Sequence, residues 1–159
     1  MTQMSEMQIA DMDLSHLDVV YGIETRSFAV PWSKNELRKE IADNKFAIYK
    51  VALLDGVVVG YAGLWHIVNE GQITNIAVDI PYRKMGIGGM LVETLISCAI
   101  RLEMIGLTLE VRVSNKAAIA LYERYGFKPE GLRKNYYARD GDGIREDAVI
   151  MWKYLNNNY

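Results

Sequence analysis

The pattern of apolar and polar positions changes its period along the chain, and each change marks an expected element. After a short strand near Met7 to Ala10, the apolar residues at positions 14, 17, 21 and 28 recur at helical spacing, which predicts a helix. Glu24 lies on the apolar face of this expected helix. Pro31 interrupts this helix, and Ser33-Lys34-Asn35-Glu36 then has the spacing of a capping box. It predicts a second helix that ends near Ala42.

The middle of the chain predicts an antiparallel meander followed by a longer helix. Residues 46–54 and 57–67 are rich in β-branched and aromatic side chains, and they flank Asp55-Gly56, a dipeptide that suits a two-residue hairpin turn. A third strand is expected over residues 72–78. Apolar residues then recur at helical spacing from Ile87 to about Glu103, which indicates an amphipathic helix.

The last third of the chain predicts a strand, a helix and two more strands. Apolar and polar residues alternate over 107–113, so this strand should place Glu110 on the face opposite to its apolar side chains. Ser114-Asn115 can cap the following helix, and Gly126 suits the left-handed residue that ends it. Strands near 127–137 and 147–154 should be joined across the turn-rich segment 140–143. We therefore expect a single α/β domain over residues 1–159, with a mixed, mostly antiparallel sheet of about seven strands flanked by about four helices.

Composition and charge exclude several classes of protein. The 159 residues are 50% hydrophobic and 24% charged, as in globular domains. A net charge of −2 provides no positive field for nucleic acid, and no apolar run reaches the roughly 18 residues that would cross a bilayer. Cys98, His16 and His66 are too few for a disulfide or a zinc site, so no metal is expected. The expectation is a cytoplasmic protein without a nucleic-acid or membrane partner.

A glycine-rich segment, Arg83-Lys84-Met85-Gly86-Ile87-Gly88-Gly89, lies between an expected strand and an expected helix. Glycines let a ligand approach the backbone, and the free amides of a helix N-terminus attract anions, so the segment predicts a site for a pyrophosphate. A dinucleotide fingerprint is disfavoured because Leu91 stands where its third glycine belongs, and a P-loop because no Lys-Ser/Thr pair opens the helix. A turn without a ligand is the remaining alternative.

The same segment resembles a coenzyme A loop. Arg83-x-x-Gly86-x-Gly88 is similar to the Q/R-x-x-G-x-G/A motif of the GNAT superfamily of N-acetyltransferases, and residues 73–78 resemble the strand that precedes that motif. Other segments resemble the RimI-type branch of the superfamily, which acetylates the N-terminus of a small-subunit ribosomal protein: Pro31-Trp32-Ser33, Leu109-Glu110-Val111-Arg112 with Ser114-Asn115, Ala120-Leu121-Tyr122-Glu123 with Tyr125-Gly126-Phe127, and Asn135-Tyr136-Tyr137 with Arg145-Glu146-Asp147-Ala148. The resemblance spans nearly the whole chain.

The resemblance implies transfer of the acetyl group of acetyl-CoA to the α-amine of a protein N-terminus, that of a ribosomal protein beginning with alanine. It implies Glu110 as the proton acceptor and Tyr122 as the general acid for the departing thiolate. For the coenzyme, it implies contacts from a strand, the glycine-rich segment and a helix cap: Ile76, Ala77, Val78, Arg83, Lys84, Met85, Gly86, Ile87, Gly88, Gly89 and Asn115. The candidates for binding the acceptor peptide are Glu24, Trp32 and Tyr137.

Two further expectations concern the walls of the site. In that superfamily the fourth and fifth strands separate at a bulge, and an amide at or next to Val78 is expected to bind the thioester oxygen. Glu24 and Glu146-Asp147 together could attract a basic residue near the N-terminus of the acceptor.

Other interpretations of the same residues stay open. Glu110 could be a solvated residue of a strand, and Tyr122 and Trp32 could be packing residues. Glu24 fits the rim of a core as well as the wall of a pocket. The function could also be acetylation of a lysine side chain or a small amine, or the chain could be a non-catalytic module that senses acetyl-CoA.

Overall fold

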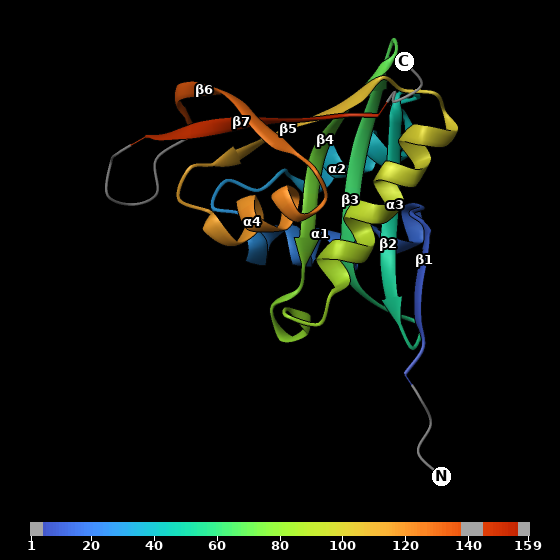
Figure 1. Cartoon of the computed structure of the whole chain (residues 1–159). Coiled ribbons are helices and arrows are strands. Elements are labelled where there is room, and N and C mark those ends of the chain that lie inside the picture. Colours follow the sequence, from blue (N-terminus) through green and yellow to red (C-terminus); the bar gives the residue numbers. More distant parts are fainter. Residues whose placement is uncertain (1–4, 138–144, 156–159) are drawn as a thin grey trace.

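Strands and helices follow one another in the order expected from the sequence (Figure 1). The computed structural model describes residues 5–137 and 145–155. Two short 3₁₀ turns, Leu14–His16 and Ile80–Tyr82, precede the first helix and the glycine-rich segment. The remaining elements are β1 (Met7–Asp11), α1 (Leu17–Ser27), α2 (Lys34–Ala42), β2 (Ala47–Leu54), β3 (Val57–Ile67), β4 (Glu70–Val78), α3 (Ile87–Arg101), β5 (Gly106–Arg112), α4 (Lys116–Arg124), β6 (Lys128–Tyr137) and β7 (Glu146–Tyr154).

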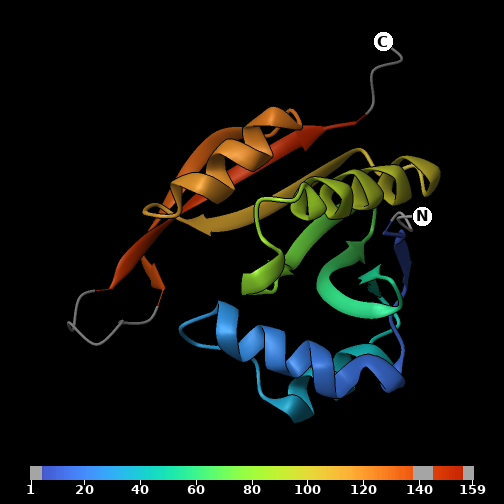
Figure 2. The same cartoon turned by 90° about the horizontal axis from the view of Figure 1, so that it is seen from below.

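The strands form one sheet with helices on both faces. Within the described ranges the seven strands have the order β1-β2-β3-β4-β5-β7-β6, and each neighbouring pair is antiparallel except β4 and β5. Figure 2 shows α1 on one side of the sheet and α3 on the other, and α4 shares a core with α3. None of the helices in these ranges is long and apolar enough to span a membrane. The mixed, mostly antiparallel sheet with four flanking α-helices confirms the expected fold class.

Each face of the sheet carries its own hydrophobic core. The larger core lies under α3 and α4 and includes Leu64, Leu91, Leu107 and Phe127. The smaller core lies under α1 and α2 and is formed by Leu17, Val20, Ile23, Leu37, Val51, Tyr61 and Ala77. Because side chains alternate along a strand, neighbouring residues of β4 contribute to different cores: Ile76 packs on the larger one and Ala77 belongs to the smaller.

Short-range sequence signals account for several turns and caps. Asp55 and Gly56 have φ angles of 50° and 82°, as the predicted hairpin turn requires. Ser33 and Glu36 form the predicted capping box at the start of α2. Gly126 follows α4 with a φ of 93°. These predictions are confirmed, and each rests on interactions between residues that are close together in the sequence.

The ends of helices and strands differ from the expected ones where apolar periodicity continues past a cap. Leu14 lies in the 3₁₀ turn before α1 and Phe28 follows its last residue, so neither belongs to the helix, and they are 50% and 36% exposed. α3 ends before Glu103, whose φ of 58° is not helical. Val113 lies beyond β5 and is 36% exposed rather than part of its apolar face. The expected turn at 140–143 falls outside the described residues.

Candidate active site

Strands β4 and β5 are hydrogen-bonded at one end only. Their parallel ladder joins Glu70–Gln72 to Gly106–Thr108, and no further pair joins them among the described residues. A register shift between β3 and β4 leaves Thr74 unmatched, which is a β-bulge. The bulge and the short ladder let the two strands diverge, and this separation is the one that the family resemblance implies.

A cavity of about 570 Å³ lies between the diverging strands. It is lined by residues 73–76 of β4, residues 109–112 of β5, and residues 27–30 at the end of α1 and just after it. The other lining residues are Asn115, Ala118, Tyr122, Tyr136 and Tyr137. The volume suits a small-molecule site. Five of the predicted site residues therefore meet in one cavity: Ile76, Glu110, Asn115, Tyr122 and Tyr137.

The side chains that line the cavity come from opposite faces of the sheet. Leu109 and Val111 belong to the core under α3, so alternation along β5 places Glu110 on the face that carries α1. Tyr122 and Ala118 belong to α4, on the face that carries α3. We call these the α1 face and the α3 face. Two ligands that approach from different faces can meet in the gap between β4 and β5.

Glu110 is mostly enclosed and has two polar partners. Its side chain is 14% exposed, and the Nε atom of Arg133 lies 2.8 Å from its Oε1. The hydroxyl of Tyr136 is hydrogen-bonded to the same carboxylate, and this bond together with burial raises the pKa of Tyr136. Glu110 is thus a cavity residue and not a solvated residue of an outer strand face. A carboxylate in this position can accept a proton from an amine in the cavity.

Tyr122 combines a packing role with a polar group at the cavity. The residue is 8% exposed, and its ring centroid lies 5.8 Å from that of Phe127. Burial raises the pKa of Tyr122 to about 12, so the hydroxyl stays protonated at neutral pH. Asn115, which lines the same cavity, caps α4 through a hydrogen bond from the Ala118 amide to its Oδ1 at 3.2 Å. The predicted N-cap is confirmed.

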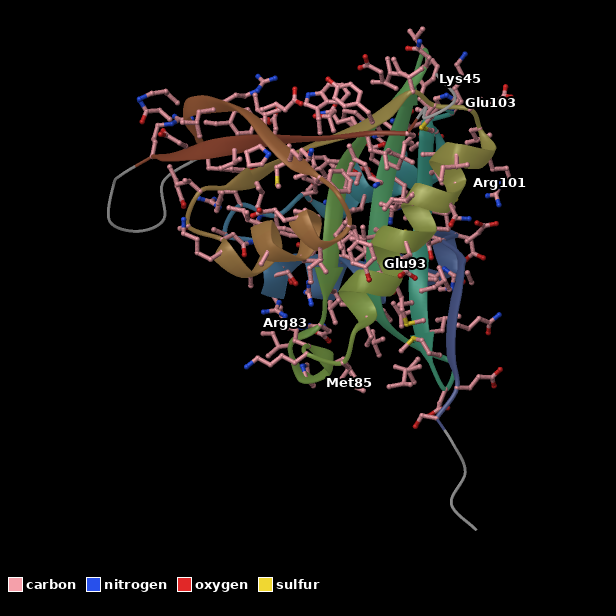
Figure 3. The ribbon with its side chains drawn as sticks, in the orientation of Figure 1. Lys45, Arg83, Met85, Glu93, Arg101 and Glu103 are labelled. Atoms are coloured by element: carbon pink, nitrogen blue, oxygen red, sulfur yellow. The ribbon has the colours of Figure 1, made fainter. Side chains whose placement is uncertain are left out.

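The glycine-rich segment forms the N-terminus of α3, and Figure 3 labels Arg83 and Met85 on this loop. Gly86 is the N-cap with a φ of 82°, and Met90 donates the first helical hydrogen bond to its carbonyl at 3.1 Å. The amides before Met90 in the first turn have no helical acceptor, so they can bind an anion. Gly89 has a packing role as well, because a Cβ there would lie 2.5 Å from the Tyr125 hydroxyl oxygen. Lys84 and Met85 are exposed.

The hydrogen bonds of β4 near Val78 indicate where the amide of this residue points. Asp79 donates its amide to the Val59 carbonyl of β3 at 2.8 Å. Successive amides of a strand point in opposite directions, so the amide of Val78 faces away from β3 and toward the gap. The Val78 carbonyl accepts a hydrogen bond from Arg83 Nε at 2.8 Å, and Arg83 also lies 3.4 Å from Ser27 Oγ. Arg83 therefore ties the loop to β4 and to the end of α1.

Two residues expected to bind the acceptor peptide lie outside the cavity. Glu24 is 1% exposed, and its carboxylate accepts hydrogen bonds from the Trp32 amide at 2.9 Å, from Asn75 Nδ2 at 3.1 Å and from the Tyr61 hydroxyl. It is a core residue that holds the segment after α1. The ring of Trp32 lies 6.5 Å from that of Trp65, and both line a separate cavity of about 520 Å³ beside α2.

The other acidic residues expected to attract a basic peptide already have partners. Glu146 lies 3.3 Å from Arg112 and accepts the Ser114 amide at 2.7 Å. Asp147 accepts the Asn135 amide at 2.8 Å. Glu24 is buried and Glu146 is paired with Arg112, whereas Asp147 is hydrogen-bonded to a backbone amide. The expected preference for a basic residue near the acceptor N-terminus stays a prediction.

Sequence reasoning missed three residues that the structure brings to the site. Arg133 and Tyr136 reach Glu110 from β6, although β7 lies between β5 and β6 in the sheet. Asn75 lines the cavity and donates to Glu24, while its side-chain oxygen has no hydrogen-bond partner among the described residues. The sequence signal for Tyr136 was its place next to Tyr137 in a family-like segment. In the described part of the chain, no cluster of three or more His, Cys, Asp or Glu side chains could hold a metal ion.

The chain belongs to the acetyltransferase (GNAT) family, which it matches over residues 17–127. The gap between β4 and β5, beside the glycine-rich N-terminus of α3, is therefore the candidate site of an acyltransferase. It is 40% identical over 145 residues to the ribosomal protein bS18-alanine N-acetyltransferase of Escherichia coli (strain K12), with 90% of this chain and 94% of that protein covered. The crystal structure of the ribosomal-protein-S18-alanine N-acetyltransferase from Escherichia coli gives a TM-score of 0.86 at 34% identity, covering 97% and 99% of the two chains. Arabidopsis thaliana NAA60 in complex with acetyl-CoA shares the fold, with a TM-score of 0.87 at 16% identity over 96% and 100% of the chains.

Proposed function

We propose that the protein transfers the acetyl group of acetyl-CoA to the α-amine of a protein N-terminus, that of a ribosomal protein of the bS18 kind that begins with alanine. The observation that carries the proposal is the gap between β4 and β5, which has Glu110 on the α1 face and Tyr122 on the α3 face. A bS18-alanine N-acetyltransferase that matches the chain over 90% of its length supports this choice of acceptor.

The residues on the α3 face fit acetyl-CoA. The amides of Ile87, Gly88 and Gly89 can bind the pyrophosphate, and Asn115 lies on the wall of the cavity beyond them. The amide of Val78 faces the gap, where it can donate to the thioester oxygen. The coenzyme supplies an acetyl group that is activated as a thioester. The α1 face, with Glu110 and Tyr137, is left for the acceptor.

In this proposal Glu110 accepts a proton from the ammonium form of the acceptor, and the neutral nitrogen then attacks the thioester carbonyl carbon. An α-amine has a pKa of about 8, so a minor share of the acceptor molecules is already neutral near pH 7. Glu110 has to take a proton only from the acceptor molecules that are still protonated. The Val78 amide stabilises the negative charge that develops on the carbonyl oxygen. When the carbon–sulfur bond breaks, Tyr122 donates its hydroxyl proton to the sulfur, and the second proton that the nitrogen loses restores the Tyr122 hydroxyl as the N-acetylated chain is released.

The role of Tyr122 as a proton donor depends more on its contact with the sulfur atom than on the acidity of its hydroxyl. Its pKa of about 12 lies above that of a free thiol, so complete transfer to a solvated thiolate would be unfavourable by about 5 kcal/mol. A thiolate inside the cavity also loses solvation, and this raises its own pKa and narrows the difference. Tyr122 can therefore act on a sulfur that is held against it, and it is a poor donor to one in water.

Mass spectrometry of peptides incubated with the protein and acetyl-CoA tests the function. We expect acetylation at the α-amine of an alanine-first peptide and little reaction of the same peptide with a blocked N-terminus and an internal lysine. If the blocked lysine peptide is the better acceptor, the protein is a side-chain acetyltransferase. Coenzyme binding without thiol release, with any amine, would instead define a sensing module.

A further inference from the structure

Glu110 has a resident counter-ion in the free protein. Arg133 Nε lies 2.8 Å from Glu110 Oε1, and among the described residues no other cationic side chain pairs with this carboxylate. Arg112 is on the same strand but is held elsewhere, since its guanidinium lies 4.5 Å from the ring centroid of Tyr137 and 3.3 Å from Glu146 Oε1. The pair between Glu110 and Arg133 is therefore separate from the contacts of Arg112 with Tyr137 and with Glu146, the first residue of β7.

The two partners of this ion pair are buried to different extents. The side chain of Glu110 is 14% exposed, whereas that of Arg133 is 55% exposed. A carboxylate that loses its partner while still enclosed is destabilised, because water cannot replace the lost interaction fully. An exposed guanidinium that leaves regains its hydration at little cost. Arg133 can therefore move away readily, provided that another cation takes its place on Glu110.

Strand β6 is distorted directly after Arg133. The register of β6 against β7 shifts between Arg133 and Tyr137, and Asn135 within the shift has a φ of 53°. Asp147 accepts the amide of Asn135 at 2.8 Å, and Arg145 Nε donates to its carbonyl at 2.9 Å. A left-handed conformation is uncommon for a residue with a side chain, so these contacts stabilise a shape that a regular edge strand would not adopt. Figure 2 shows the pair of strands β6 and β7 extending past the rest of the sheet.

We propose that Arg133 occupies, in the free protein, the position on Glu110 that the ammonium group of the acceptor takes, and that this resident cation keeps Glu110 from activating water. The inference rests on the proposed function, in which Glu110 accepts the proton of the amine. An arginine side chain keeps its proton at physiological pH, so it balances the charge of Glu110 without reacting. An α-ammonium brings the same charge and can lose a proton to the carboxylate.

An acceptor ammonium group can replace the guanidinium of Arg133 as the counter-ion of Glu110, whereas a water molecule cannot. In hydrolysis, the oxygen of water bonds to the thioester carbonyl carbon, the carbon–sulfur bond breaks, and one proton of water passes to the base while acetate and the thiol form. Water is neutral, so its entry in place of Arg133 would leave the enclosed Glu110 carboxylate without a counter-ion. An ammonium group replaces one positive charge by another. Arg133 therefore favours acetyl transfer over loss of the acetyl group to water.

The test compares Arg133→Gln with Lys134→Gln, which removes the same charge from the next residue, an exposed position of the same strand. Thiol release from acetyl-CoA is measured without an acceptor, and KM and kcat are measured with an alanine-first peptide. We expect Arg133→Gln to raise acceptor-independent thiol release about fivefold or more and to lower the peptide KM about threefold, with kcat within about twofold of the parent. Lys134→Gln should change none of these values.

Two further variants show whether the effect acts through Glu110. Adding Glu110→Gln to Arg133→Gln should abolish the increase in thiol release. Arg133→Lys keeps the positive charge, so its rate of thiol release should stay close to the low rate of the parent. Unchanged thiol release in Arg133→Gln would overturn the proposal. An increased peptide KM would also overturn it, because Arg133 would then bind the acceptor directly. If the parent acetylates no N-terminal peptide, the proposed function fails, while the measurement without acceptor still decides the role of Arg133.

Discussion

Replacing Glu24 by alanine should destabilise the protein, because its carboxylate is the common acceptor of three buried or partly buried donors. These are the Trp32 amide, Asn75 Nδ2 and the Tyr61 hydroxyl, and Glu24 itself is 1% exposed. An unsatisfied buried polar group costs about 1–3 kcal/mol, and rearrangement of Trp32 and Asn75 should recover part of the total. We therefore expect Glu24→Ala to lower the free energy of unfolding by about 3–5 kcal/mol.

Urea unfolding followed by tryptophan fluorescence measures this change, and in a thermal scan the same loss corresponds to a Tm lower by about 6–20 °C. Glu93→Ala on α3 is the matched control, since Glu93 is an exposed helical glutamate, and it should change the free energy of unfolding by no more than about 0.5 kcal/mol. Glu24→Gln keeps the volume and one oxygen acceptor, so its loss should be intermediate. A loss below about 1 kcal/mol in Glu24→Ala would refute the reasoning that these hydrogen bonds hold the segment after α1.

Three further predictions concern catalysis and coenzyme binding. Tyr122→Phe should keep the affinity for acetyl-CoA and lower kcat by about 10²–10⁴ in steady-state kinetics, and activity within about threefold of the parent would exclude an acid role. Gly88→Val should weaken acetyl-CoA binding about tenfold or more in calorimetry, because a Cβ at Gly88 would lie 3.3 Å from Leu121 Cδ2 and the larger side chain would cover the first-turn amides; unchanged affinity in a folded variant would place the coenzyme elsewhere. Glu110→Gln should lower kcat/KM most near pH 7 and less above about pH 8, where the acceptor amine is neutral without a base; a defect independent of pH would assign Glu110 to positioning.

Elements whose geometry depends on neighbouring residues could be predicted from the sequence. The hairpin at Asp55-Gly56 and the capping box of Ser33 and Glu36 follow from local backbone and side-chain preferences. The length of the ladder between β4 and β5 could not be predicted in this way. It depends on how two strands that are joined through α3 meet in space, and only the resemblance to a known family indicated that they separate.

The site shows the same division between local and distant interactions. Alternation along β5 correctly placed Glu110 opposite the apolar face of its strand. Its partner Arg133 could not be predicted, because the sheet order brings β7 between β5 and β6 and the contact crosses that strand. Helical periodicity likewise put Glu24 on the apolar face of α1, but the donors that enclose it come from β3, β4 and the segment after α1. The spacing of apolar residues shows on which face of a helix or strand a side chain lies. How deeply that side chain is buried depends on residues far away in the sequence.

The short ladder between β4 and β5 divides the sheet into two parts with a weak seam. Among the residues that the structure describes, the ladder that joins strands β1–β4 to strands β5–β7 has three residue pairs, Glu70–Gln72 with Gly106–Thr108. Amides beside this seam have fewer bonds to break before they exchange with solvent than amides inside either part. A ligand that lies in the gap and forms hydrogen bonds with both β4 and β5 connects the two parts of the sheet. Because it binds only the folded protein, it raises the free energy of unfolding. The melting temperature of this protein should therefore rise with the concentration of acetyl-CoA.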